Sequence, residues 1–309
     1  MTKNIIRLNI FFDTILLIVV SVFFYLSIPI RSSSVIYMPQ GSISGIITYL
    51  SKNNFDINQL DKYILRIMGK PQSGWIDIGS TELTKGDFLY KLTKSKAALQ
   101  DITLIPGETM YFFIQDASKI FGLSEKSLWD AYHKYSPLPD GIILPNTYKL
   151  PLGISANYFM QYLLNQSMNK HKELAIKVLG EFDAKQWFRY VTMASIVQKE
   201  AADKEEMPII AAVIYNRIRI GMPLQMDGSL NYGKYSHIKV TPERIKNDTT
   251  PYNTYKHRGV PPYPIGSASM DAILAVINPA NVKYLYFVKT KTGKHIFSNT
   301  YKQHLKNVK

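Results

Sequence analysis

The chain has 309 residues, of which 46% are apolar and 19% are charged, so it can bury a core and is not disordered as a whole. Its 37 Lys and Arg against 23 Asp and Glu give a formal charge of +14, which favours anionic partners such as nucleic acid, an acidic membrane face or an acidic polymer. The absence of cysteine excludes disulfides, thiolate nucleophiles and Cys-ligated metal sites.

The amino terminus predicts a membrane anchor. A short basic segment, residues 1–7, precedes an apolar transmembrane stretch, residues 8–30, in which Asp13 is the one formal charge before the end of the span. About 20 mostly apolar residues cross a bilayer if Asp13 lies near the headgroups. A cleaved signal peptide is the alternative, but the stretch exceeds the usual h-region of about 7–15 residues, and no clear cleavage site follows it. Since positive charge stays in the cytoplasm, we expect a single-pass inner-membrane protein with its bulk on the periplasmic, extracytoplasmic side.

Residues 31–122 repeat a strand–turn–helix pattern three times, which predicts a small membrane-proximal α/β module. Ile43, Ile46, Ile47 and Leu50 have helical spacing after the first strand. The second unit pairs a strand around Trp75 with a helix that starts near Thr84, and the third turns at Pro106-Gly107.

Residues 123–309 are mainly helical, which completes an α+β fold. Ser124, Ser155 and Asp183 are placed to cap three helices, the last of which runs to Glu206, and another helix spans 208–219. Residues 228–266, rich in Tyr, Pro, Asn and Gly, predict a long structured loop region. A short helix over 270–277 and a hairpin formed by 284–288 and 295–297 follow.

Glu200 is the first candidate for catalysis. Met193, Ile196 and Val197 precede it by seven, four and three residues, which places them on the same helix face. A carboxyl on an apolar face loses hydration, and its raised pKa suits a general acid. The alternative is that Glu200 ends a helix and points to water. Glu206, in a charged run, is interpreted as solvated.

The loops after the helices carry polar and aromatic groups that suit sugar rings, which offer both C–H faces and hydroxyls. The alternative is that these side chains merely pack on the domain. The candidates are Gln225, Asp227, Asn231, Tyr232, Tyr252, Asn253 and Tyr255.

Templates of other chemistries are missing from the sequence. It contains no GxxxxGK[ST], HExxH or GxSxG, and its six His lack metal-ligand spacing. His295 lies in a predicted strand and is interpreted as structural. No pattern typical of nucleic-acid recognition accompanies the basic residues, so we expect no nucleic-acid partner.

Several strings together resemble the endolytic murein transglycosylases, the MltG or YceG-like family. DGIILPNTY is similar to that family's Glu-Gly-(apolar)₃-Pro-Asp-Thr-Tyr loop, and YMPQGSISGIITYL and GDFLYKL…ITLIPGETMYFFIQDAS are similar to its LysM-like region. The resemblance covers nearly all of the chain after the anchor, in the family's order. The C-terminal strings are MASIVQKEA…MPIIAAVIYNRIRIGMPLQMDGSLNYG, TPYNTYKHRGVPPYPIG and NPANVKYLYFVKTKTGKHIFSNTYKQH.

The resemblance implies a transmembrane anchor, a LysM-like module over 31–122 and a catalytic domain over 123–309. It implies an endolytic lytic transglycosylase that cuts nascent peptidoglycan glycan strands at MurNAc–GlcNAc bonds, leaves 1,6-anhydro-MurNAc ends and so limits strand elongation. No metal or organic cofactor is implied, and peptidoglycan synthases are candidate partners. The family's catalytic Glu matches Glu200, and Asn216 and Ser229 in the matching strings join the candidate substrate-binding residues.

The sequence departs from the family's usual pattern in several places. Gln198 stands where another Glu is common, Asn146 replaces an Asp, and Gly228-Ser229 replaces Pro-Thr. A lysozyme-like muramidase, which would be a hydrolase, and a non-catalytic peptidoglycan-binding membrane protein remain the alternatives.

Overall fold

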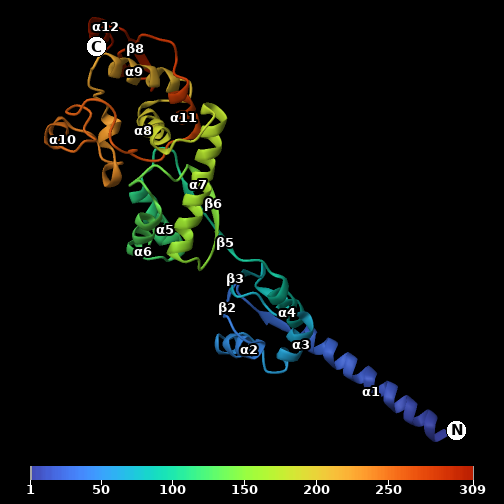
Figure 1. Ribbon diagram of the computed structural model, residues 1–309. Coiled ribbons are helices and arrows are strands. Elements are labelled where there is room, and N and C mark those ends of the chain that lie inside the picture. Colours follow the sequence, from blue (N-terminus) through green and yellow to red (C-terminus); the bar gives the residue numbers. More distant parts are fainter. Residues whose placement is uncertain (1, 309) are drawn as a thin grey trace. The chain divides into compact units, whose positions relative to one another are not determined.

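The computed structural model describes residues 2–308, which divide into two compact units (Figure 1). The first unit contains the residues up to Gln100 together with Leu150–Gly153, and the second contains the remainder. Among the described residues every sheet has two strands, and helices make up most of the second unit. The fold is therefore α+β, as predicted.

The compact units differ from the modules expected from the sequence. The change was expected between residues 122 and 123, whereas residues 101–122 pack within the second unit. A strand–turn–helix pattern fixes local structure and does not determine which core its helix joins.

The N-terminal helix α1, Thr2–Ser27, has 26 residues. Its segment Ile5–Ser27 is apolar over 23 residues, long enough to cross a membrane, and is not buried within the protein. The helix begins and ends earlier than the predicted span of 8–30. It stops before Pro29, because proline disfavours the helical conformation of the residue that precedes it. The following strand β1, Pro29–Arg31, pairs antiparallel with β4, Glu82–Thr84.

The first unit has its own core between small sheets and helices. Strand β2, Val35–Met38, pairs antiparallel with β3, Gly74–Asp77. The Oγ of Ser42 accepts a hydrogen bond from the N–H of Gly45 and caps the first of three helices. These helices are α2, Ile43–Lys52, α3, Asp61–Met68, and α4, Lys85–Lys94. The core includes Ile36, Ile46, Leu50, Leu65, Phe88 and Leu92.

The second unit contains most of sheet β5–β6 and begins with three helices. Strand β5, Leu99–Leu104, pairs with β6, Asn146–Pro151. Ser155 caps α7 by accepting from the N–H of Tyr158, whereas Ser124 stands at the start of α6 without a capping hydrogen bond from its side chain. The helices are α5, Met110–Phe121, α6, Glu125–Tyr135, and α7, Ala156–Leu179.

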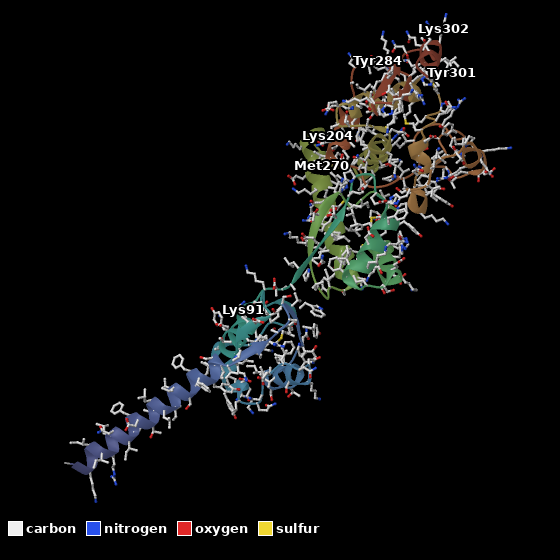
Figure 2. All side chains as sticks on the ribbon, turned by 180° about the vertical axis from the view of Figure 1, so that it is seen from behind. Lys91, Lys204, Met270, Tyr284, Tyr301 and Lys302 are labelled. Carbon is white, nitrogen blue, oxygen red and sulfur yellow. The ribbon has the colours of Figure 1, made fainter. Side chains whose placement is uncertain are left out.

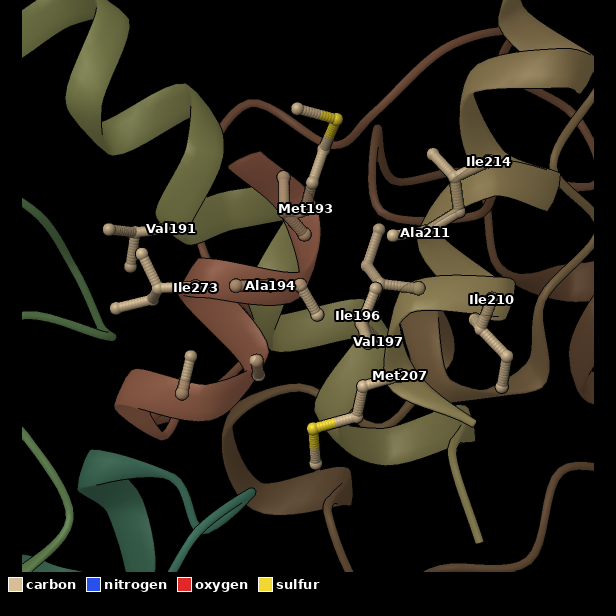
Figure 3. Packing of buried hydrophobic residues seen from close by; sticks show 14 of the residues in the cluster. Val191, Met193, Ala194, Ile196, Val197, Met207, Ile210, Ala211, Ile214 and Ile273 are labelled. Carbon is tan, nitrogen blue, oxygen red and sulfur yellow. The ribbon is translucent and has the colours of Figure 1, made fainter. Parts of the chain in front are cut away.

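The core of the second unit is formed largely by α8, Ala184–Glu200, α9, Met207–Arg219, and α11, Met270–Ile277. Figure 3 shows Ala194 and Ile196 of α8 between Ala211 of α9 and Ile273 of α11. Asp183 caps α8 as predicted, but the helix ends at Glu200 and not at Glu206. The chain turns over the intervening residues before α9 begins.

The loop region after α9 contains short helices that the sequence did not predict. These are η1, Asp227–Leu230, η2, Gly233–Tyr235, and α10, Pro242–Asn247. The predicted hairpin is present as β7, Tyr286–Lys289, antiparallel to β8, His295–Ser298. An unpredicted helix, α12, Tyr301–Asn307, follows it, and Tyr284, Tyr301 and Lys302 are labelled at this end of the unit in Figure 2.

Candidate active site

Glu200 is the last residue of α8, one turn beyond the residues of that helix that are buried in the core of the second unit. The side chains that share its face, Met193, Ile196 and Val197, are buried in that core, as the helical spacing predicts. Glu200 itself is only partly buried. Glu200 therefore lies at the end of a buried apolar helix face without being sealed within the core, as is needed for a group that exchanges protons with a substrate.

A glycine holds the Glu200 carboxyl. The backbone N–H of Gly228, in η1, donates a hydrogen bond of 2.7 Å to Oε1 of Glu200. A Cβ at position 228 would lie 2.8 Å from that oxygen and 3.0 Å from Cβ of Lys199. Gly228 thus allows the loop to approach the end of α8 closely enough for its N–H to reach the carboxyl.

The surroundings of Glu200 favour its protonated form. The pKa of Glu200 is raised to about 7, with burial as the largest cause and the negative charge of Asp227 acting in the same direction, whereas the Gly228 hydrogen bond, His295 and Arg217 act in the opposite direction. The C-terminal end of a helix also disfavours a negative charge. Near neutral pH the carboxyl can therefore both give and accept a proton.

Asp227 and Tyr255 form a polar pair close to Glu200. The Tyr255 hydroxyl donates a hydrogen bond of 2.7 Å to Oδ1 of Asp227. Burial, this hydrogen bond and the charges of Asp227 and Glu200 raise the pKa of Tyr255, so its hydroxyl keeps its proton. Gln225, two residues before Asp227, has an exposed side chain and a φ of 48°, a left-handed conformation that is uncommon for residues other than glycine.

Tyr232 and Tyr252 stack with ring centroids 4.4 Å apart and an interplanar angle of 18°. Both side chains are partly buried, and the Tyr232 hydroxyl donates to Oδ2 of Asp248 at 3.2 Å. Burial raises the pKa of Tyr252 to about 12. The pair is an aromatic surface of the kind that packs on a sugar ring, and at the same time it supports its own loop.

Three other candidates have their polar atoms engaged within the protein. Asn216 donates from Nδ2 to the carbonyls of Val282 and Tyr284, at 2.9 and 3.0 Å. The buried Ser229 hydroxyl donates to the carbonyl of Met226 at 2.7 Å. Asn253 donates from Nδ2 to the carbonyls of Ile245 and Asp248. These hydrogen bonds show that all three side chains stabilise the loops around them.

Three charged or titratable side chains were not predicted from the sequence to belong to the site, namely Arg217, Glu206 and His295. Arg217 is 6% exposed and donates from Nε to the carbonyl of Leu285 at 2.6 Å. The interpretation of Glu206 as solvated is wrong. Its residue is only 5% exposed, and its carboxylate lies 2.6 Å from Nδ1 of His295. One sequence feature could have indicated that Glu206 is buried. It directly precedes Met207-Pro208, a helix start at which the chain reverses and can enclose a side chain.

Two further features of the described residues bear on ligands. No group of three or more His, Asp or Glu there could hold a metal ion. A cavity of about 670 Å³ in the second unit is lined by apolar side chains such as Phe182 and Phe188 and by Lys172, Lys185 and Arg189, and Glu200 is not among its lining residues.

Comparison with known proteins places these features in a family context. Residues 36–309 match the YceG-like family. A 118-residue segment is 37% identical to the endolytic murein transglycosylase of Bacillus subtilis strain 168 and covers 38% of this chain and 33% of that protein. A 175-residue segment is 33% identical to the endolytic murein transglycosylase of Streptococcus pneumoniae strain R6 and covers 55% of this chain and 31% of that protein. The chain thus spans about a third of the length of these curated relatives.

The fold is also similar to the crystal structure of a yceG-like protein from Listeria monocytogenes. The TM-score is 0.57 at 24% sequence identity, over 90% of this chain and 99% of that chain. This likeness supports the fold alone.

Proposed function

Since residues 36–309 match its model, the chain belongs to the YceG-like family, and we propose that it is an endolytic lytic transglycosylase that cleaves peptidoglycan glycan strands. The observation that carries the proposal is Glu200, a carboxyl with a pKa of about 7 held by the N–H of Gly228 at the end of α8. Two relatives that match parts of this chain are named endolytic murein transglycosylases, which supports the same substrate class.

In the proposed mechanism one carboxyl acts twice. Protonated Glu200 donates its proton to the glycosidic oxygen while the bond from that oxygen to C1 of N-acetylmuramic acid breaks. The resulting carboxylate then takes the proton of the sugar's C6 hydroxyl, whose oxygen attacks C1 and closes a 1,6-anhydro ring. Because the nucleophile belongs to the substrate, it is already positioned and no water needs activation. Atoms balance without a cofactor, and Glu200 ends in its starting protonation state.

The neighbours of Glu200 have supporting roles in this proposal. Burial is the main cause that favours the protonated carboxyl in the resting enzyme, and the like charge of Asp227 adds to it. The carboxylate of Asp227 can stabilise the positive charge that develops at C1. Tyr255, which bonds Asp227, and the exposed Gln225 offer polar atoms to the sugar hydroxyls. The Tyr232–Tyr252 stack offers an aromatic face for a sugar ring.

We further propose that α1 is a single-pass anchor in the inner membrane and that the catalytic residues lie on the periplasmic side. The length and apolar character of Ile5–Ser27 support this placement. A tether would confine the site to the space where nascent strands emerge, close to peptidoglycan synthases. The proposed LysM-like module over 31–122 would bind the same strands. The small sheets and helices of the first unit support it up to Gln100, whereas residues 101–122 belong to the second unit.

Mass spectrometry of the products tests the function. Purified full-length protein in detergent is incubated with glycan strands, and we expect fragments that end in 1,6-anhydro-N-acetylmuramic acid. Reducing ends heavier by one water would indicate a lysozyme-like hydrolase instead, with Asp227 as the obvious second carboxyl. Strand binding without any product would favour a non-catalytic binding protein.

A further inference from the structure

The carboxylate of Glu206 joins two segments of the second unit, residues 201–206 and strand β8. Its Oε2 accepts a hydrogen bond of 3.1 Å from the N–H of Ala202, two residues after Glu200. Its Oε1 accepts from the N–H of His295 at 2.8 Å, and its Oε2 accepts from Nδ1 of His295 at 2.6 Å. One buried carboxylate therefore ties the chain that follows Glu200 to strand β8, 89 residues further along.

The His295 ring is held in one orientation by this contact. Its side chain is 6% exposed and that of Glu206 is 7% exposed, so the pair is shielded from solvent. A hydrogen bond to a carboxylate in such surroundings is short and strong. Because the Nδ1 proton is committed to Glu206, Nε2 is the ring nitrogen left to respond to other charges.

Glu206 is the buried member of a set of polar contacts that fix residues 201–206. Lys294, next to His295, pairs with Oδ2 of Asp203 at 2.7 Å. Lys204 pairs with Asp271 of α11, and Figure 2 shows Lys204 near Met270, the first residue of that helix. The Asp203 and Lys204 pairs are largely exposed, so water screens them and they contribute little. The Glu206–His295 contact is buried, and through Glu206 it also reaches the N–H of Ala202, two residues after Glu200.

We propose that Glu206 and His295 form a positioning pair for Glu200, in which Glu206 orients the imidazole and the imidazole stabilises the carboxylate left after Glu200 gives up its proton. The inference extends the proposed function and rests on it for the role of Glu200. In a single-carboxyl mechanism the deprotonated state must survive long enough to accept the C6 proton, so groups that favour this state must offset the charge of Asp227.

The charges that face Glu200 come from several elements. Asp227 of η1 opposes ionisation, whereas the Gly228 N–H, His295 of β8 and Arg217 of α9 favour it. Tyr255 is also close, but its hydroxyl is bound to Asp227. Removal of the imidazole leaves Arg217 as the cation favouring the carboxylate, so ionisation of Glu200 should require a higher pH.

The test compares His295→Asn with wild type in the full-length protein in detergent. The Asn amide can donate to Glu206 from nearly the position of Nδ1, so the anchoring of β8 is kept while the ring is lost. Glu206→Gln is the second variant, because it keeps a side chain of the same length but removes the charge that orients His295. Lys294→Met is the control, since it deletes the neighbouring ion pair and leaves Glu206 untouched.

Two readouts are measured for each variant. The first is the titration of the Glu200 carboxyl by NMR with ¹³C-labelled Glu, its signal being assigned as the one lost in Glu200→Gln. The second is the pH dependence of kcat/KM for strand cleavage. In His295→Asn and Glu206→Gln we expect the Glu200 titration and the alkaline limb of the profile to move to higher pH by about half a pH unit or more, and kcat to fall about tenfold with KM little changed. Lys294→Met should match wild type in both.

An unchanged Glu200 titration in folded His295→Asn and Glu206→Gln would overturn the proposal and leave the pair a structural clamp. Circular dichroism and urea unfolding establish that each variant is folded. If wild type released no anhydro-ended product while the Glu200 titration still moved as expected, the proposed function would fail and the positioning pair would stand. The two failures are therefore distinguishable.

Discussion

The N–H of Gly228 lies 2.7 Å from Oε1 of Glu200, and the space that a Cβ at position 228 would occupy lies 2.8 Å from the same oxygen. The loop therefore approaches the end of α8 as closely as a residue without a side chain allows. The carboxyl is oriented by a backbone donor, which does not titrate and has little freedom to move. This contact makes the position of Glu200 depend on the identity of residue 228.

Gly228→Ala should impair catalysis more than folding. The added methyl displaces the Glu200 carboxyl or the loop, and a displacement near 1 Å at a reacting group costs about 100-fold in rate. Strand cleavage, measured by release of anhydro-ended fragments, should fall by about that factor. Gly45→Ala is the matched control, because the nearest atom to its added Cβ is 3.5 Å away, and cleavage should be unchanged. Equal activity of both variants would contradict the close-approach argument.

Asp227→Asn should lower the pH above which activity is lost. The negative charge of Asp227 raises the pKa of Glu200, so its removal lets Glu200 ionise at lower pH. Since the acid form is required, the alkaline limb of kcat/KM, expected near pH 7 in wild type, moves to lower pH. Asn can still accept from the Tyr255 hydroxyl. Asp116→Asn, at an exposed site on α5, should not move the limb, and a shift to higher pH in Asp227→Asn would refute this electrostatic account.

His171 should make the second unit less stable in acid. Burial lowers the pKa of His171 to about 4, and its ring accepts from Nε1 of Trp187 at 3.1 Å and bonds the carbonyl of Ile142 at 2.9 Å. The neutral ring therefore stabilises the fold fully above its ordinary pKa of 6.5, and this stability is lost as the pH falls towards 4. The difference between the two pKa values corresponds to about 3 kcal/mol.

Urea unfolding followed by tryptophan fluorescence between pH 7 and pH 4 measures this loss. His171→Gln should be less stable at pH 7 and should show a correspondingly smaller decline on acidification. His133→Gln, at an exposed position, should retain the wild-type pH dependence. A wild-type slope that persists in His171→Gln would show that another group is responsible.

Asn216→Ala should destabilise the second unit. It leaves the carbonyls of Val282 and Tyr284 without their amide donor in a buried place, which costs about 1–3 kcal/mol. The midpoint of urea unfolding should fall with little change in slope. Asn281→Ala, an exposed change on the same segment, should be neutral within about 0.5 kcal/mol. A fully stable Asn216→Ala with weakened strand binding would instead assign Asn216 to the substrate.

Local patterns in the sequence predicted the parts of the fold that depend on local chemistry. Ser155 and Asp183 cap helices as predicted, Ser124 stands at the predicted helix start without a side-chain capping bond, and the hairpin lies where it was predicted. Helices α3, α10 and α12 were missed because each has only six to eight residues, too few for a clear helical period. Their stability comes from packing and caps that a linear pattern does not reveal.

In the candidate site, too, features within one helix could be predicted, whereas contacts between distant segments could not. Helical spacing predicted that Met193, Ile196 and Val197 support Glu200, since all four share one element. It could not predict Glu206 with His295, because the contact joins residues 89 apart in the chain. Composition likewise could not distinguish polar side chains that face the solvent, such as Gln225, from those that bond their own backbone, such as Asn253.

The central claim is that the Glu200 carboxyl moves both protons, and one comparison tests it most directly. Full-length Glu200→Gln and wild type are incubated at pH 6 with the same purified glycan strands, and anhydro-ended fragments are quantified by mass spectrometry. Gln has the same shape and cannot donate a carboxylic proton, so we expect a folded protein that still binds strands and whose product falls by at least about 10³-fold. Release of anhydro-ended fragments by folded Glu200→Gln at a rate close to that of wild type would contradict the account.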